Sequence, residues 1–332
     1  MRVILITGGA GFIGSHAIEH FLKNYPDYII INLDKLTYAG SLENMRLFID
    51  NPRHFFIQGD ICDKALLDKI FIEYGVSDVI HFAAESHVDN SIAGPDVFMQ
   101  TNVMGTFCLL EAAHKHWRGN AKSNRFHHIS TDEVYGSLGE TGYFTEESPY
   151  RPSSPYSASK AASDHLVRSY YKTYGLNTVI TNCSNNYGPH QHKEKFIPTI
   201  ITKALAGEKI PVYGSGKNVR DWLYVGDHCE AIDKVFHGAQ GGETFVIGEG
   251  NGISNVELTY LICQMIDKMY PQDYKRESLI TFIDDRLGHD FRYAILPQKI
   301  KARFDWVSRT AFTIGLHNII DFYMEKWAIV PI

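Results

Sequence analysis

The chain has 332 residues, of which 44% are hydrophobic and 21% are charged, and its formal net charge is -6. This length accommodates one large α/β unit plus a smaller lobe, and the composition argues against a disordered chain. The negative net charge offers no general basic surface, so we expect no nucleic acid as a partner.

The five cysteines are widely spaced, and no two of them form a Cys-x-x-Cys pair. This spacing favours reduced thiols in a cytosolic protein over a disulfide framework or a zinc site. The first residues, MRVILITGG, enter a strand-like segment without the features of a signal peptide, and no later run is long enough to span a bilayer. We therefore expect a cytoplasmic protein with no membrane partner and no metal.

Short β-branched runs alternate with longer amphipathic stretches through the first half of the chain. The predicted strands cover residues 3–7, 28–34, 55–60, 78–84, 126–131 and 177–183. The predicted helices cover residues 12–24, 64–73, 95–116 and 155–174. This alternation predicts an α/β fold built on a Rossmann-like, doubly wound parallel sheet with right-handed crossovers.

After residue 183 the alternation loosens. Turn-rich stretches interrupt it, and a strand over residues 244–247 and a helix from about Asn255 follow. We predict a first domain over residues 1–183 and a smaller C-terminal substrate-binding lobe over residues 184–332, with some segments of the lobe returning to the first domain.

A GxGxxG pattern of Gly9, Gly11 and Gly14 joins the first predicted strand to the first predicted helix. Glycines there permit a tight turn and the close approach of a pyrophosphate, which the helix N-terminus attracts. Asp34 ends the next strand, where a carboxylate accepts hydrogen bonds from the adenosine ribose and repels a 2′-phosphate. The pattern predicts an NAD-binding Rossmann domain, although the neighbouring Lys35 slightly weakens the preference over NADP.

Other residues follow the strands of the same predicted sheet. The carboxylate of Asp60 either reaches the adenine edge or caps a helix, and its position leaves both interpretations open. The turn over residues 83–86 lies at the carboxyl end of a further strand, beside the predicted cofactor crevice.

Tyr156 and Lys160 stand four residues apart at the start of a predicted helix, after Ser154 as N-cap and Pro155 at the first position. An i, i+4 pair shares one helix face, so the ammonium lies near the phenol. A free tyrosine has a pKa of about 10. A nearby lysine and a nicotinamide cation stabilise the phenolate, which makes hydride removal from a carbinol feasible.

The segment Thr131, Asp132 and Glu133 closes another predicted strand. The hydroxyl of Thr131 is available to the same carbinol oxygen as Tyr156. The two carboxyls are either solvated turn residues or an acid and base pair whose surroundings push their pKa values apart. Their place at the carboxyl end of a strand, beside the Tyr–Lys pair, favours the acid and base hypothesis.

Many motifs in order resemble one known family. They are GGAGFIGSH, DKLTYAGS, GDICD, AAESHVDNS, STDEVYG, SPYSASKAASDHLV, NNYGP, EKFIP, VRDWLYV and GHDFRYA. From about Met1 to Trp327 the chain resembles the dTDP-glucose 4,6-dehydratases of the extended short-chain dehydrogenase/reductase group. The resemblance implies a lyase of deoxysugar biosynthesis that uses NAD and binds a nucleotide-sugar substrate.

The resemblance also implies a role for each catalytic residue. Tyr156 removes the C4 hydroxyl proton while NAD takes the C4 hydride, Glu133 abstracts the C5 proton, and Asp132 protonates the departing C6 hydroxyl. The hydride then returns to C6, so the net reaction is a dehydration. The predicted catalytic residues are Thr131, Asp132, Glu133, Tyr156 and Lys160.

The motifs and the resemblance together predict the binding residues. The predicted cofactor residues are Gly8, Gly11, Phe12, Ile13, Gly14, Asp34, Lys35, Leu36, Thr37, Asp60, Ile61, Ala83, Ala84, Ser86, Thr101, Tyr156, Lys160 and Asn186. The predicted substrate residues are Ser86, Thr131, Asn185, Lys195, Phe196, Pro211, Tyr213, Arg220, Asn255, Arg286 and His289. Arg220 offers the planar fork that suits a diphosphate.

Several alternatives share these features. A sugar-nucleotide 4-epimerase needs NAD, Tyr156 and Lys160 but not the two carboxyls, a UDP-glucose 4,6-dehydratase differs only in the base, and a non-catalytic NAD-binding sensor needs only the glycine loop and Asp34. The pair His190 and His192 suggests a metal, but no convincing third ligand accompanies it. Similar enzymes pair the two long helices across a dimer interface, so the resemblance implies a homodimer.

Overall fold

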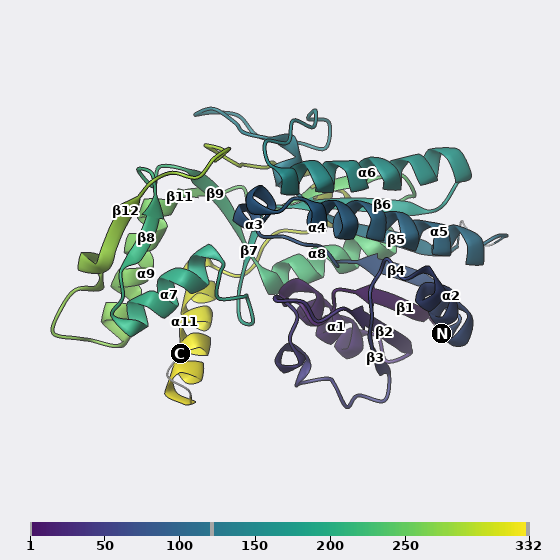
Figure 1. The fold of residues 1–332 in the computed structure, drawn as a ribbon, viewed down its shortest axis with the longest axis horizontal. Helices are drawn as coiled ribbons and strands as arrows, with labels where there is room; N and C mark the ends of the chain where they lie inside the picture. The colour runs from purple at the N-terminus through teal and green to yellow at the C-terminus, as the bar shows by residue number, and fades with distance from the viewer. Residues whose placement is uncertain (1, 120–122, 330–332) are drawn as a thin grey trace.

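A seven-stranded parallel sheet forms the centre of the molecule in a computed structural model that describes residues 2–119 and 123–329 (Figure 1). The strand order is β3-β2-β1-β4-β5-β6-β10. The strands are β1 (Arg2–Thr7), β2 (Tyr28–Asp34), β3 (His54–Gln58), β4 (Asp78–His81), β5 (Arg125–Thr131), β6 (Thr178–Cys183) and β10 (Thr244–Ile247). The chain winds outward in both directions from β1 and β4, so the predicted Rossmann-like, doubly wound sheet is confirmed.

Helices cover both faces of this sheet. On one face α1 (Phe12–Asn24) packs against α8 (Val225–Gly238), and on the other α2 (Lys64–Tyr74), α5 (Thr106–His116) and α6 (Pro155–Tyr174) lie in succession. The alternation of side chains along β1 serves both layers. Ile4 and Ile6 pack with α1 and α8, whereas Leu5 packs with the helices of the opposite face, and all three are fully buried. Burial on both faces explains why the strands are almost continuously apolar.

Two strands are shorter than the sequence predicts. β3 ends at Gln58 rather than at residue 60, and β4 ends at His81 rather than at residue 84. In both places the chain leaves the sheet at its carboxyl edge. The last predicted residues of each strand therefore lie in loops beside the crevice.

The helix predicted over residues 95–116 is helical but not uniform. It comprises α4 (Asp96–Phe98), a π-helical segment η2 (Met99–Gly105) and α5, and a short unpredicted helix, α3 (Val88–Ala93), precedes it. Within the π-helical turn, Asn102 points inward and exchanges hydrogen bonds with the backbone N–H and carbonyl of Glu85, at 2.8 and 3.0 Å. The wider turn thus places a buried amide where it can hold the loop after β4.

The second half of the chain builds a separate hydrophobic core. It contains α7 (Phe196–Ala206), α9 (Asn255–Met269) and α11 (Phe312–Ile329), and its buried residues include Ile200, Ile262 and Leu316. Two small sheets flank these helices. Their strands are β7 (Asn185–Tyr187), β9 (Val219–Tyr224) and β11 (Gly252–Ser254) in one, and β8 (Ile210–Tyr213) and β12 (Ile280–Ile283) in the other.

Some later elements lie with the first sheet. β10 pairs with β6, α8 covers β6, and α10 (Gln298–Phe304) packs against both α8 and β10. Three short 3-10 helices, η1 (Leu42–Met45), η3 (Asp132–Tyr135) and η4 (Arg276–Leu279), complete the elements. The exact domain boundary near residue 183 stays a prediction.

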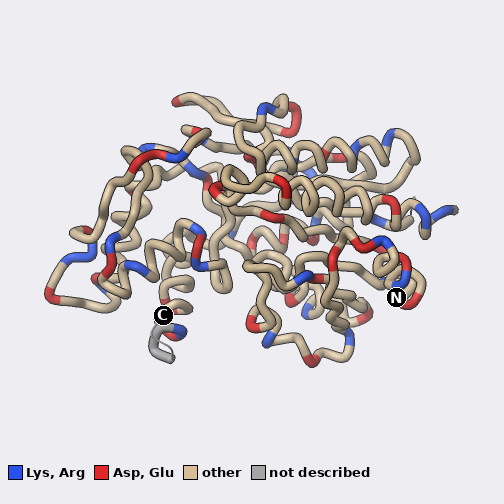
Figure 2. Tube along the Cα trace, in the orientation of Figure 1, with Lys and Arg blue, Asp and Glu red and all other residues tan. Residues whose placement is uncertain are grey.

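Positions of acidic and basic residues are interspersed along the chain (Figure 2). In the part of the chain that the structure describes, no helix combines the length and the apolar character that a membrane span requires.

Candidate active site

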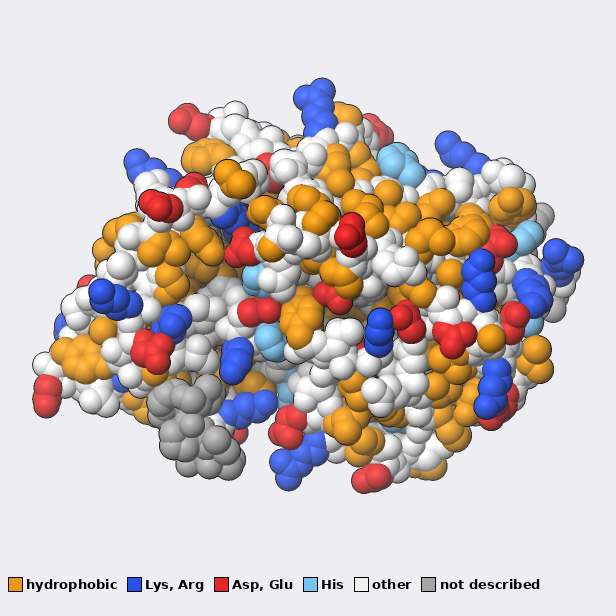
Figure 3. Space-filling model, viewed as in Figure 1, with side chains coloured by type: hydrophobic (Ala, Val, Ile, Leu, Met, Phe, Trp, Pro, Cys, Tyr) orange, Lys and Arg blue, Asp and Glu red, His pale blue; other side chains and the backbone are white. Residues whose placement is uncertain are grey.

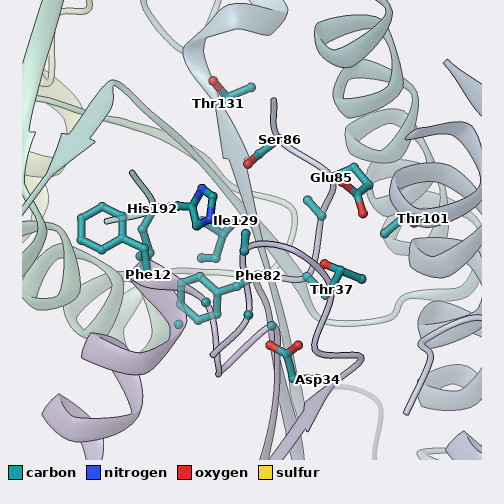
Figure 4. Close-up of a pocket in the computed structure, with 18 of the residues that line it drawn as sticks. Phe12, Asp34, Thr37, Phe82, Glu85, Ser86, Thr101, Ile129, Thr131 and His192 are labelled. Carbon is teal, nitrogen blue, oxygen red and sulfur yellow. The ribbon is translucent and has the colours of Figure 1, made fainter. Parts of the chain in front are cut away.

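A cleft of about 310 Å³ lies at the carboxyl ends of the central strands (Figure 4). All predicted cofactor residues except Leu36 line it. Figure 4 shows Asp34 and Thr37 toward one end and Thr131 toward the other, with Phe82 and Ile129 between them. An elongated cleft at this edge of a doubly wound sheet is the geometry that an extended dinucleotide requires.

The glycine turn after β1 leaves no space for side chains. Gly8 has a φ of +74°, and a Cβ added to it would lie 2.7 Å from the backbone nitrogen of Ala83. A Cβ on Gly14 would lie 2.2 Å from the carbonyl oxygen of Gly8. The first turn of α1 therefore packs directly on the turn before it, so the N-terminus of the helix faces the cleft as a pyrophosphate site requires.

The carboxylate of Asp34 holds this turn together. It accepts hydrogen bonds from the backbone N–H groups of Ala10, at 2.9 Å, and Leu36, at 2.8 Å, and the residue is 8% exposed. Burial raises the pKa of Asp34, and the two backbone hydrogen bonds counter that rise. Leu36 has a φ of +56° and contributes this N–H rather than a surface of the cleft.

Lys35 does not stand free beside Asp34. Its Nζ lies 2.8 Å from Asp60 Oδ2, and the other oxygen of Asp60 accepts the N–H of Cys62. The N-cap of α2 is Asp63, so the helix-cap interpretation of Asp60 is wrong for that helix. Asp60 balances the charge of Lys35. Lys35 therefore gives little reason to expect NADP in place of NAD.

Tyr156 and Lys160 lie in the first turns of α6, which starts as predicted. Ser154 and Ser157 form a reciprocal capping box and Pro155 occupies the first turn. Tyr156 is 8% exposed and Lys160 is 4% exposed, and both line the cleft. The Lys160 ammonium donates a hydrogen bond to the carbonyl of Ile129 in β5, at 2.9 Å. Burial lowers the pKa of Lys160 and raises that of Tyr156 well above its usual value.

The three polar residues after β5 adopt different environments. The backbone N–H of Glu133 donates to the hydroxyl of Thr131, at 3.2 Å, as η3 begins. Thr131 and Glu133 line the cleft, whereas Asp132 is 1% exposed and does not. Burial and the neighbouring Glu133 and Asp221 raise the pKa of Asp132 well above its usual value. Burial also raises the pKa of Glu133, but three cations oppose the rise: Arg286, Arg220 and Lys195.

The structure brings only part of the predicted substrate set to the cleft. Ser86, Thr131, Asn185 and Lys195 line it, and the ammonium of Lys195 donates to the carbonyl of Ser86 at 2.9 Å. The remaining residues lie in the second lobe, outside the lining of this cleft. They are Phe196, Pro211, Tyr213, Arg220, Asn255, Arg286 and His289.

Several of these residues outside the cleft contact other groups of the protein. Arg220 is 5% exposed, lies over the ring of Tyr293 at 4.2 Å and donates to the carbonyl of Asp290. Tyr213 donates to Asp89 Oδ2 at 3.1 Å, and Arg286 lies 3.7 Å from the other oxygen of the same carboxylate. His289 contacts Asp285 at 2.6 Å. Arg220 and Arg286 nevertheless act electrostatically on Glu133, so they border the reacting end of the cleft.

Some residues of the lining were not predicted as cofactor or substrate residues. Glu85 lies within the motif AAESHVDNS, whereas Gln191 and His192 come from an irregular loop in which only the histidine pair suggested a role, as metal ligands. His192 meets Tyr38 edge to face with ring centroids 5.7 Å apart, whereas His190 packs against Phe322 instead. The two histidines therefore do not converge. Among the described residues, no group of three or more potential His, Cys, Asp or Glu ligands is placed to hold a metal.

Comparisons with known proteins agree with this geometry. The family model described as GDP-mannose 4,6 dehydratase matches residues 5–319. A dTDP-glucose 4,6-dehydratase from Neisseria meningitidis is 50% identical over 98% of this chain and 94% of its own length. The dTDP-glucose 4,6-dehydratase 1 of Escherichia coli is 46% identical over 98% of this chain and 94% of its own length.

Solved structures give the same picture. A dTDP-glucose 4,6-dehydratase from Streptomyces venezuelae, with NAD and TYD bound, has a TM-score of 0.91 and 44% identity over 99% of this chain and 98% of its own. A UDP-glucose 4-epimerase from Thermotoga maritima has a TM-score of 0.86 at 26% identity, covering 98% of this chain and 99% of its own. The fold is thus shared with epimerases, and the higher identity lies with the dehydratases.

The contact at Gly14 predicts a specific effect on cofactor binding. In Gly14→Ala the new methyl group meets the Gly8 carbonyl at 2.2 Å, so the turn must shift away from the pyrophosphate site. We expect the Kd for NAD, measured by isothermal titration calorimetry, to rise at least about tenfold, or ~1.4 kcal/mol. Gly139→Ala is the matched control because an added Cβ there meets nothing within 4 Å. An unchanged Kd in folded Gly14→Ala protein would contradict this account of the turn.

Proposed function

The chain belongs to the GDP-mannose 4,6 dehydratase family of extended short-chain dehydrogenases, and we propose that it is an NAD-dependent dTDP-glucose 4,6-dehydratase. This lyase converts dTDP-glucose to dTDP-4-keto-6-deoxyglucose and water, a step of deoxysugar biosynthesis. The observation that carries the proposal is the carboxyl pair Asp132 and Glu133 at the end of β5, beside the cleft that Tyr156 and Lys160 line. A UDP-glucose dehydratase is not favoured by the relatives, which are named for dTDP-glucose.

The site fits NAD because the glycine turn admits no side chain and Asp34 lies where a ribose binds. Bound NAD supplies a reversible hydride acceptor, which oxidises C4 of the sugar and later reduces C6. Tyr156 takes the C4 hydroxyl proton, and the Lys160 ammonium stabilises the phenolate that accepts it. The hydroxyl of Thr131 donates to the same sugar oxygen and orients it.

The elimination requires one carboxylate and one carboxylic acid. The C4 carbonyl makes the C5 proton acidic, and Glu133 takes that proton because three cations favour its ionised form. Asp132 gives its proton to the C6 hydroxyl, which leaves as water. The higher pKa of Asp132, raised by burial and by the charge of Glu133, keeps it protonated for this step. C5 regains a proton after reduction at C6.

The diphosphate is proposed to bind near the cations of the second lobe. Arg220 in β9, Lys195 just before α7 and Arg286 in the loop after β12 all influence Glu133. A diphosphate close to them brings the hexose between Glu133 and the nicotinamide end of the cleft. Asn185, Asn255 and His289 complete the proposed nucleotide-sugar site, together with Phe196, Pro211 and Tyr213.

A homodimer is also proposed. Apolar side chains gather over α4, η2 and α6 in the space-filling view (Figure 3). Val97, Met99 and Met104 are 47%, 41% and 43% exposed, and Tyr171 and Tyr174 on α6 are also exposed. Such a patch on paired long helices fits helix packing between two copies. We further place the protein in the cytoplasm, which its five free cysteines support.

The proposed activity has a direct test. Wild-type protein given dTDP-glucose in deuterated water should release one water per sugar and incorporate one deuterium at C5, measured by mass spectrometry and NMR. UDP-glucose should react at least about tenfold more slowly in kcat/KM, and Tyr156→Phe should lose about 100-fold or more in kcat. Recovery of dTDP-galactose without loss of mass would instead identify a 4-epimerase. Binding of NAD with no turnover of any hexose nucleotide would favour the sensor.

Neutralising each of the two carboxyls in turn should slow a different step of the reaction. In Glu133→Gln the exchange of the C5 proton should fall about 100-fold or more, while substrate-dependent NADH formation persists because C4 oxidation does not need Glu133. In Asp132→Asn the C5 exchange should persist and the release of water should fall by a similar factor. The measurements are deuterium exchange by NMR and absorbance at the NADH band. Loss of NADH formation in folded Glu133→Gln protein would overturn the division of roles.

The dimer proposal predicts a change of mass in solution. Met104→Glu places a charge within the apolar patch, so we expect the monomer to predominate at micromolar concentration, measured by light scattering after size exclusion. Leu47→Glu is the control, because Leu47 is 76% exposed in the loop after η1. A wild-type protein that is monomeric at these concentrations would contradict the proposal.

A further inference from the structure

The inner face of the catalytic helix carries a third ionisable residue. Tyr156, Lys160 and Asp164 are spaced four residues apart along α6, so they follow one another on one side of it. Asp164 has 0% exposure and lies one turn beyond Lys160. None of the steps described above uses it. Burying a carboxylate costs free energy, and an apolar residue at this position of the helix would avoid that cost. The presence of Asp164 therefore indicates a role for its charge.

The carboxylate of Asp164 has three polar neighbours from different segments. The Tyr150 hydroxyl donates to Oδ2 at 2.7 Å, and Asn182 in β6 donates to the same oxygen at 3.0 Å. His128 Nε2 in β5 approaches Oδ1 to 3.2 Å and also contacts the Ser163 hydroxyl at 3.2 Å. Arg168, one turn further along α6, donates to the Tyr150 hydroxyl at 2.6 Å. Hydrogen bonds to the ionised form thus lower the pKa of Asp164 in spite of its burial.

The negative charge of Asp164 is not cancelled by its histidine neighbour. Burial and the charge of Lys160 lower the pKa of His128 to about 4, so this imidazole is neutral near pH 7. His81 in β4, whose ring lies 5.2 Å from that of His128, also has its pKa lowered well below the usual value by burial. Burial raises the pKa of Tyr135 in η3, which Asp164 also influences, far above its usual value, so this phenol stays neutral.

Lys160 lacks a carboxylate partner in direct contact among the described residues. The hydrogen bond recorded for its ammonium goes to the neutral carbonyl of Ile129. Burial lowers the pKa of Lys160, and the charge of Asp164 is the largest influence that opposes this loss, with the Cys183 thiol second. Asp164 does not line the cleft and lies one turn further along α6 than Lys160, so its charge acts on the ammonium from outside the cleft.

We propose that Asp164 is a positioning residue that keeps the Lys160 ammonium charged in its buried site, so that Tyr156 can ionise. Asp164 itself touches neither substrate nor cofactor. Tyr150, Asn182 and His128 orient its carboxylate, and Arg168 orients Tyr150. The inference rests on the proposed function, because it assigns to Lys160 the stabilisation of the Tyr156 phenolate.

The sign of the effect follows from the order of the charges along the helix. Without the charge of Asp164 the pKa of Lys160 falls, and the ammonium is lost at a lower pH. A neutral lysine no longer stabilises the phenolate, so the pKa of Tyr156 rises. The main electrostatic influences on Tyr156 come from Glu133, Cys183 and Asp132, and Asp164 is not among them. In this proposal Asp164 therefore acts on Tyr156 through Lys160, which lies between them on α6. The acid limb of the rate profile must therefore move to higher pH.

The test is the pH dependence of kcat in Asp164→Asn, which keeps the size of the side chain and removes its charge. We expect the acid limb to move up by about one pH unit and kcat at pH 7 to fall about tenfold. KM for dTDP-glucose should change less than about twofold, and activity should recover toward that of the wild type as pH rises. Asp164→Ser tests the same loss of charge with a smaller side chain, in case the amide is not accommodated.

Asp233→Asn is the matched control. Asp233 in α8 accepts a hydrogen bond from Tyr25 at 2.6 Å and contacts His20 at 2.7 Å, so it resembles Asp164 in its partners. It joins α1 to α8 on the opposite face of the sheet. We expect this variant to lose thermal stability without any movement of the acid limb. An acid limb that stays in place in folded Asp164→Asn or Asp164→Ser protein would overturn the proposal, whatever the change in Tm.

Failure of the proposed function would be recognised separately. If the wild type oxidises a hexose nucleotide without releasing water, the dehydratase proposal fails. The pH profile of that oxidation, followed as NADH, still tests Asp164 because the oxidation uses Tyr156 and Lys160 and does not need the two carboxyls. If the wild type releases water normally and the profiles of the variants coincide, only the inference about Asp164 fails.

Discussion

The hydrogen bond from the Lys160 ammonium to the Ile129 carbonyl fixes the catalytic helix against the strand that carries the two carboxyls. Ile129 lies two residues before Thr131, so the bond ties α6 to the end of β5. The capping box at Ser154 and Ser157 determines where α6 begins, and therefore where Tyr156 lies relative to that strand. This bond thus joins the helix to the strand end beside the cleft. A buried cation can serve there only if its charge is balanced nearby.

Two groups of charges surround the reacting end of the cleft. On one side Asp164 lies behind Lys160, within a buried network that spans β5, β6 and α6. On the other side Arg220, Arg286 and Lys195 oppose the rise in the pKa of Glu133. Of these three cations, only Arg220 is a main influence that opposes the rise in the pKa of Asp132. The pKa of Asp132 is therefore raised further. Burial therefore raises the pKa of both adjacent carboxyls, and the cations limit the rise more at Glu133 than at Asp132, as the proposed acid and base roles require.

The parts predicted from sequence were those encoded by local pattern. The glycine turn, Asp34 and the start of α6 each depend on residues within one strand, turn or helix end, and these features lie where the motifs place them. The interruption of the predicted helix over residues 95–116 depends instead on Asn102, whose partners at Glu85 and Ser159 are distant in sequence. No local pattern reveals such partners. Asp164 is part of the quoted motif SPYSASKAASDHLV, but its role becomes visible only when Tyr150 and His128 are placed beside it.

The substrate lobe gives a second example of contacts that no local sequence pattern reveals. Tyr213 and Arg286 were predicted to meet the nucleotide sugar, and both contact Asp89 of α3 across the two lobes. The ion pair is long, at 3.7 Å, and its side chains are 21% and 37% exposed, so it stabilises the structure only weakly. A diphosphate carries more charge than one carboxylate and accepts more hydrogen bonds from an arginine fork. Arg286 can therefore exchange Asp89 for a phosphate at small cost, so this contact between the lobes is one that the proposed substrate can replace.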